Sequence, residues 1–420
     1  MWTRFHIKCS SCDKVTNLRI QIPEKETLPV SFNCLGCASE LRATLFVNFE
    51  KATWDFKVER GTLIKGDFHS GDFFHEFSDT LATSKPSDKP HDILMPTLRM
   101  PTSKLEKLKD TKDKRKLHSN EEWEDFKDLA RAYIRFDKPV IVKLVKKIIG
   151  DIYPDNLFVY KIDLDYHRNY FLTLNYLVFP WIDFDNHSDF ISWLSKNIFN
   201  QTNTTNADLL DYVQNITTDD VCDKIRKDVS ELTIRFVDLR ENFFYANNDQ
   251  IGTDSFAAVQ DFTHLKNFYT DCFEFIGRTS HLIFRLQNFY ERGNQNTVPS
   301  SSPRNVTTAA TFAALDHGQK LDVLNLSSEP EPKLIYSFSF DSKLRNGINH
   351  FKAKLDNKTQ IISYYPVTKR PDEEFQIKYI DFLNLSLDSF NSVLKIGQLI
   401  KMVTIFKVAT KKHDQQKGSR

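Results

Sequence analysis

The sequence predicts an α+β protein that is mainly helical and has a β-rich unit at its N-terminus. Its 420 residues include only 12 Gly and 15 Pro, and so few chain-breaking residues favour long helices. Apolar and polar side chains alternate, as is typical of strands, at residues 18–22, 41–49 and 54–58. Residues 251–420 instead place apolar side chains three to four positions apart, which predicts a helical bundle.

The order of these patterns predicts four consecutive segments. Residues 1–81 form the β unit, and residues 82–119 form a linker with four prolines that ends in a basic stretch. We interpret this stretch as solvated, with an RNA-steering patch as the alternative. Residues 120–250 form a mixed α/β middle region, and residues 251–420 form the helical unit.

The middle region is predicted to begin with helices and to continue with strands. Ser119 is a helix-capping residue type and acidic residues follow it, which predicts a helix start. Residues 156–184 are aromatic and β-branched, so two strands are expected there. On a strand, Asp163, Asp165 and His167 would share one face; a polar strand face is expected, with a metal site as the alternative.

The helical unit is predicted to contain long helices joined by irregular segments. Helices are expected at residues 255–290, 341–355 and 378–408, with a short extended stretch at 356–366. Glycine, proline and serine interrupt the helical pattern after residue 290.

Composition excludes several classes of function. The 57 Lys and Arg residues balance 56 Asp and Glu residues, so a local site must do any nucleic-acid binding. No apolar window of about 18 residues occurs, which predicts no transmembrane helix and no membrane partner. The first residues lack a secretory signal pattern, so a cytoplasmic location with reduced cysteines is expected. No phosphate-binding or dinucleotide-binding glycine motif occurs.

Four cysteines form two CxxC motifs near the N-terminus. Cys9 and Cys12 make the first motif, and Cys34 and Cys37 make the second one, with 21 residues between the two motifs. Two intervening residues let a tight turn aim both sulfurs at one tetrahedral metal. The pattern resembles the zinc ribbon family, which implies one structural, non-catalytic Zn²⁺ per chain. Coincidental core cysteines and a redox pair are the alternatives. The two remaining cysteines lie on apolar helical faces and are predicted to be core residues: Cys222 and Cys272.

A second group of chemically suited residues lies in the sequence LRNGINHF. Here Arg345 and Asn346 are followed by His350, and on a helix Asn346 and His350 share one face. This R-N-x-x-x-H motif, next to a long terminal helix, resembles the HEPN superfamily of higher eukaryote and prokaryote nucleotide-binding domains. The resemblance covers about residues 255–420, with an irregular insert near 291–333.

The resemblance implies a metal-independent endoribonuclease that cleaves RNA and acts as a toxin-like or antiviral effector. In this chemistry His350 would transfer a proton, Arg345 would bind the phosphate, and Asn346 would bind the phosphate or orient the histidine. An acidic residue on the earlier helix is also implied, and Asp271 and Glu274 are both candidates.

One histidine cannot be acid and base at once, so a homodimer through the C-terminal helices is expected. No catalytic metal is expected, and a protein trigger or antitoxin would remain to be identified. The alternatives are a surface arginine with a core histidine, or a non-catalytic module of the same fold that binds RNA or a protein.

Overall fold

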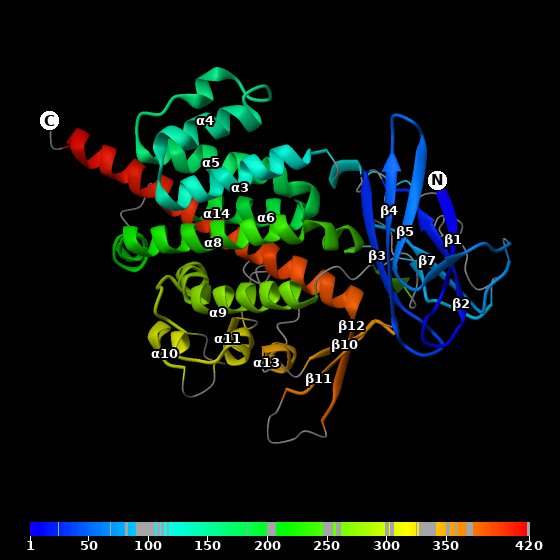
Figure 1. The fold of residues 1–420 in the computed structure, drawn as a ribbon. Coiled ribbons are helices and arrows are strands. Elements are labelled where there is room, and N and C mark those ends of the chain that lie inside the picture. Colours follow the sequence, from blue (N-terminus) through cyan, green and yellow to red (C-terminus); the bar gives the residue numbers. More distant parts are fainter. Residues whose placement is uncertain are drawn as a thin grey trace. The chain divides into compact units, whose positions relative to one another are not determined.

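The computed structural model resolves the chain into two compact units, each assembled from three separated stretches (Figure 1). Unit 1 contains Met1–Lys116, Leu239–Leu265 and Asn346–Asn384, and unit 2 contains Leu117–Asp238, Lys266–Arg345 and Leu385–Arg420. The sequence predicts four consecutive segments, whereas each unit of the structure combines stretches that are far apart in the sequence. The structure describes residues 1–23, 25–67, 69–79, 83–89, 106, 110, 113–115, 117–182, 184–199, 207–246, 255–257, 262–298, 302, 306–324, 326, 342–349, 353–357, 359–366 and 373–417.

Unit 1 is built from antiparallel hairpins. One sheet has the strand order β6-β1-β2-β7 and a second has the order β3-β4-β5. Strand β7 is parallel to β2, and the other pairs in these sheets are antiparallel. The strands of the two sheets are β1 (Trp2–Lys8), β2 (Val15–Gln21), β3 (Thr27–Asn33), β4 (Glu40–Asn48), β5 (Thr53–Arg60), β6 (Thr62–Ile64) and β7 (Phe73–Phe77).

The two sheets share one apolar core, which is made by the alternation that the sequence shows. In β4, Leu41, Ala43 and Leu45 are buried while the residues between them are not. Phe5 of β1 stacks on Phe56 of β5 with ring centroids 3.9 Å apart. The predicted strands at 18–22, 41–49 and 54–58 are confirmed as β2, β4 and β5.

Unit 1 also contains short strands from distant parts of the chain. Strand β8 (Thr83–Ser84) pairs with β9 (Ser255–Phe256). A third sheet has the order β10-β11-β12, from Lys354–Asp356, Ile361–Tyr364 and Phe375–Lys378. The extended stretch predicted at 356–366 is therefore confirmed.

Unit 2 is helical. The helices that supply it wholly or in part are α3 (Asn120–Arg135), α4 (Lys138–Ile149), α5 (Asp163–Val178), α6 (Phe184–Phe199), α7 (Ala207–Asp211), α8 (Asp219–Leu239), α9 (Phe262–Arg292), α10 (Ala309–Ala313), α11 (His317–Leu324), α13 (Ser342–Asn349) and α14 (Tyr379–Lys417). Short turns of other helix types lie in this unit at Asp155–Phe158, Phe179–Trp181 and Tyr212–Ile216, whereas the turn at Arg240–Tyr245 belongs to unit 1.

Large aromatic side chains fill the core of unit 2. Helix α3 begins in a capping box made by Ser119 and Glu122, as the sequence predicts. Its buried face carries Trp123, which packs edge-on against Phe236 of α8. Phe236 in turn stacks on Phe390 of α14, with ring centroids 4.5 Å apart. Aromatic rings therefore make the contacts between α3, α8 and α14 in this core.

The two strands predicted at 156–184 are wrong, because this stretch forms α5. Its apolar residues fall three to four positions apart, and the helix buries Tyr170, Leu174 and Leu177. The Asp165 carboxylate accepts hydrogen bonds from the backbone N–H groups of residues 161 and 162, which starts the helix.

The metal-site alternative at Asp163, Asp165 and His167 is also wrong. On a helix, Asp163 and His167 share a face because they are four residues apart, but Asp165 points to nearly the opposite side from both. Asp163 pairs with Lys138, and His167 is buried. These side chains therefore do not converge on one point.

Two predictions in the C-terminal region need correction. The helix predicted at 341–355 ends as α13 at Asn349, and Leu355 lies in strand β10. The insert predicted to be irregular at 291–333 contains the short helices α10 and α11. The helix predicted at 378–408 is confirmed as α14, and the one predicted at 255–290 is confirmed from Phe262 on as α9, whereas Ser255–Phe256 form strand β9. Cys222 and Cys272 are buried, as predicted.

Candidate metal centre and the arginine of helix α13

Each CxxC motif forms the loop of a β-hairpin in unit 1. The first motif joins β1 to β2, which pair along their whole length. The second motif joins β3 to β4, and all of β3 pairs with β4. The two hairpins belong to different sheets around one core, so the two loops meet through the packing of that core.

The two loops have the same backbone structure although their sequences differ. In both loops the amide of the first cysteine, Cys9 or Cys34, donates to the carbonyl five residues on, at 2.9 Å. The amides of Asp13 and Ala38, which follow each second cysteine, donate back to the carbonyl of the first cysteine at 3.0 and 2.8 Å. Both residues have a positive φ, 61° and 62°. Each loop therefore presents its two sulfurs in the same way.

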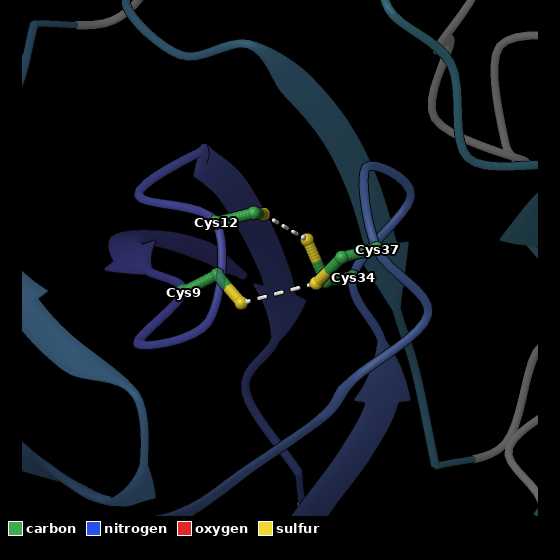
Figure 2. Close-up of side chains that lie close together, drawn as sticks. All are labelled: Cys9, Cys12, Cys34 and Cys37. Carbon is green, nitrogen blue, oxygen red and sulfur yellow. Dashed lines mark hydrogen bonds between the residues drawn. The ribbon is translucent and has the colours of Figure 1, made fainter.

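The four cysteine sulfurs converge, as Figure 2 shows. All four lie within 4.8 Å of one another. The Cys9 and Cys37 sulfurs are 3.6 Å apart, and the Cys12 and Cys34 sulfurs are also 3.6 Å apart. A tetrahedral metal with bonds of about 2.3 Å to sulfur needs sulfurs about 3.8 Å apart. The four cysteines could therefore hold one metal ion.

The surroundings favour the thiolate form of Cys37, and the two loops pack closely at Gly36. Hydrogen bonds with the hydroxyl and backbone of Ser39 lower the pKa of Cys37 to about 6, while burial raises the pKa of Cys34. A Cβ at Gly36 would lie 3.4 Å from the Cys12 sulfur, so a glycine keeps the second loop close to the first. His6 lies near the cluster but is not one of the four ligands: its Nε2 forms a hydrogen bond of 3.0 Å with the carbonyl of residue 67.

The structure places Arg345 of the second predicted site on α13. Its guanidinium forms an ion pair with Glu274 of α9, and both side chains are half-buried. His317 of α11 approaches the same carboxylate, and its Nε2 is 4.0 Å from a Glu274 oxygen. The other acidic candidate, Asp271, pairs with Arg235 of α8 instead. Of the two acidic residues, Glu274 is therefore the partner of Arg345.

The remaining residues of this motif are described in part. Asn346 follows Arg345 on α13 and is half-buried. His350 lies outside the described residues. The sequence reasoning did not identify His317, because its position in the chain, far from both α9 and α13, gives no sign that it reaches Glu274.

Within the described part of the chain, no helix combines the length and apolar character needed to cross a membrane. No protein-family model matches the sequence. No curated protein and no solved structure matches it significantly either.

Proposed function

We propose that this chain is a metal-independent endoribonuclease of HEPN type, which cleaves RNA through attack by the 2′-OH. The observation that supports the proposal is the ion pair between Arg345 and Glu274. The resemblance implies an acidic residue on an earlier helix, and Glu274, one of the two candidates, contacts the arginine. An arginine on a short helix, fixed by a carboxylate from a long one, is oriented to bind a phosphate.

The proposed roles follow from the chemistry of the cleavage step. A base takes the proton of the 2′-OH, the 2′-oxygen bonds to phosphorus, and the bond to the 5′-oxygen breaks as an acid protonates it. His350 would transfer a proton near neutral pH. Arg345 would stabilise the charge on the phosphorane, because a guanidinium can donate two parallel hydrogen bonds to phosphate oxygens. Asn346 would bind the phosphate or orient His350.

The need for both an acid and a base supports a homodimer. One His350 cannot serve as both in a single turnover, so we propose that two protomers meet through the C-terminal helices and face their motifs toward each other. The same resemblance extends the proposal to a toxin-like or antiphage effector. A cytoplasmic location is part of it, because thiols stay reduced there.

We propose that the metal at the four cysteines is Zn²⁺ and that it is structural. Four thiolates in a tetrahedron are a donor set typical of zinc, and they leave no open coordination position for a substrate. The metal would then stabilise the two hairpins of unit 1, and the chemistry would take place elsewhere.

One observation favours a second candidate, a non-catalytic module that binds RNA or a protein. Glu274 neutralises the charge of Arg345, so an arginine fixed in this way could equally stabilise α13 on α9. In that case α13 would support a binding surface and carry no chemistry.

The test is RNA cleavage by the purified protein in the presence of EDTA. We expect wild type to cleave total RNA and to leave DNA intact, and we expect His350→Ala and Arg345→Ala each to lose about 10²–10⁴ in rate. Arg235→Ala is the matched control, because Arg235 also pairs with an acidic residue of α9. Zinc content and circular dichroism in the same samples report whether the fold persists.

Two outcomes would replace the nuclease by the binding module. The first is RNA cleavage by His350→Ala as fast as by wild type. The second is a loss of cleavage on adding EDTA while zinc and fold are retained.

A further inference from the structure

Helix α9 contains a glycine in its interior, close to Glu274. Gly277 follows Glu274 by three residues, so the two positions lie on the same side of the helix. Glycine weakens a helix interior relative to alanine, and the packing here gives the reason for it. A Cβ at Gly277 would overlap the ring of His317 of α11. The His317 ring therefore lies directly on the backbone of α9, in the space that a side chain at position 277 would fill.

Two hydrogen bonds hold α11, and with it His317, in this place. Lys320 lies one turn along α11, is buried, and donates from its Nζ to the carbonyl of Gly277 at 3.1 Å. At the start of α11 the Asp316 carboxylate accepts a hydrogen bond of 2.8 Å from the amide of Gln319, as a helix cap does. The position of His317 is therefore set by the packing of α11 on α9.

This packing places Glu274 between two basic side chains. One oxygen of Glu274 pairs with Arg345 of α13, and the other oxygen lies 4.0 Å from Nε2 of His317. The exposed fraction of the side chain is 20 % for His317, 27 % for Arg345 and 32 % for Glu274. Solvent therefore reaches all three side chains, and a phosphate group of a ligand can approach them.

The protonation state of His317 decides the charge of these three side chains. When the imidazole is neutral, the charges of Glu274 and Arg345 cancel. When it is protonated, the three side chains together have one positive charge, and two cations share one carboxylate. Glu274 then holds the guanidinium less firmly but still orients it, and more of the N–H groups of Arg345 can donate to a phosphate.

Charged groups from three helices act on the titration of His317. Burial has the largest effect and lowers its pKa, whereas the neighbouring Glu274 raises it. Two cations, Lys320 and Arg345, lower the pKa further, and Asp316 raises it. The net shift is downward, so His317 in the free protein is protonated below the usual histidine value of about 6.5. A bound phosphate adds negative charge beside the ring and favours its protonated form.

We propose that His317 is a positioning residue of the proposed nuclease, which in its protonated form shares Glu274 with Arg345 and so turns the guanidinium toward an RNA phosphate. The proposal rests on the proposed function, because it requires an RNA phosphate at Arg345. His317 takes no part in proton transfer during cleavage. Because the proton on His317 and the phosphate at Arg345 strengthen each other's binding, RNA should bind more tightly at low pH, and this dependence should require His317.

RNA binding by the full chain with His350→Ala tests the proposal, because this variant removes a second titrating histidine and should leave the RNA uncut. The probe is a short single-stranded RNA of mixed sequence with a fluorescein label, and its anisotropy gives the Kd at pH 5.5 and at pH 7.5. We expect the Kd to be about fivefold lower at pH 5.5. Adding His317→Gln should reduce this difference to less than about twofold.

His281→Gln in the same background is the matched control and should keep the full pH dependence. His281 also lies on α9, and burial also lowers its pKa, but its Nδ1 forms a hydrogen bond of 2.8 Å with the carbonyl of Arg278.

Gly277→Ala is a second variant, and it keeps every titratable group. The added Cβ displaces the His317 ring from Glu274, so Gly277→Ala should remove the pH dependence as His317→Gln does. Histidine-labelled NMR without RNA gives a further measurement, with the His317 signal assigned by its loss in His317→Gln. Glu274→Gln should lower the pKa of His317, because Glu274 raises it in the wild type.

The proposal is overturned if the His350→Ala protein binds RNA equally at both pH values, or if His317→Gln or Gly277→Ala keeps the fivefold difference. It is also overturned if Glu274→Gln leaves the pKa of His317 unchanged. Failure of the proposed function gives a different result: wild type would bind RNA with this pH dependence and leave it intact, which contradicts cleavage but supports the role of His317. Absence of RNA binding at both pH values overturns both.

Discussion

Replacing Cys34 or Cys37 by serine is expected to empty the metal centre and to destabilise unit 1. Both sulfurs belong to the group of four that lies within 4.8 Å, and three thiolates hold zinc much less tightly than four. The two positions separate metal loss from packing loss, because Cys34 is buried in the core and Cys37 is exposed. Cys37→Ser should therefore report on the metal alone.

The expected size follows from the linkage between binding and folding. With free zinc at about 1,000 times the Kd, a metal that binds only the folded state stabilises it by about 4 kcal/mol. For a unit of this size, 1 kcal/mol moves the Tm by about 2–4 °C. Loss of the metal should therefore lower the Tm of unit 1 by about 8–16 °C, with a further loss for Cys34→Ser from the core.

Metal analysis by mass spectrometry and differential scanning calorimetry measure the two effects on protein purified without a chelator. Wild type should contain one zinc per chain, and both variants should contain almost none. Ser10→Ala is the matched control, since Ser10 lies inside the first loop and is exposed. The reasoning is refuted if wild type holds well under one zinc per chain, or if Cys37→Ser retains the metal.

Lowering the pH from 7.5 to 5 should destabilise unit 2, because burial lowers the pKa of His167 and of His187 to about 4. The stability that each neutral histidine contributes is present above about pH 6.5 and is lost as the pH falls toward 4. At pH 5 each histidine should therefore lower the free energy of unfolding by about 2 kcal/mol. A free energy of unfolding, measured by urea titration, that is the same at both pH values would contradict this. Phe236→Ala should lower the free energy of unfolding by about 3–5 kcal/mol, because its ring is fully buried in the aromatic core. The same urea titration measures this loss, and a change below about 1 kcal/mol would contradict it. Glu274→Gln should lower kcat for RNA cleavage about 10- to 100-fold by releasing Arg345 from its position; single-turnover kinetics measure it, and an unchanged rate would remove Glu274 from the proposed site.

Local patterns in the sequence were sufficient for the cysteine cluster and for several of the strands and helices. The spacing of Cys9, Cys12, Cys34 and Cys37 depends on tight turns, and those turns are local structures that a short stretch of sequence determines. The strand alternation at 41–49 and the long helix α14 were predictable for the same reason.

The error at 156–184 shows where local patterns become ambiguous. Aromatic and β-branched residues are enriched in strands, but they also fill the buried face of a helix in a core of large rings. The Asp165 carboxylate, which bonds the backbone at the start of α5, was the signal that favoured the helix.

Long-range contacts could not be derived from the sequence alone. Arg345 pairs with Glu274, which lies 71 positions earlier in the sequence. The sequence offers Asp271 as an equally good acidic partner, and only the packing of the helices shows that Asp271 pairs with Arg235. His317 likewise reaches Glu274 from a separate helix. No motif of fixed spacing marks such a site, so only the packing of the helices reveals it.

The chemical form of the RNA ends after cleavage tests the proposed function most directly. A defined RNA is incubated with the protein in EDTA, next to the same RNA with a single 2′-deoxy nucleotide at the cleavage position. We predict a 2′,3′-cyclic phosphate and a 5′-OH from the first RNA, no cut at the modified position of the second, and no products with His350→Ala. Products that end in a 3′-OH, or cleavage at the 2′-deoxy position, would contradict the account.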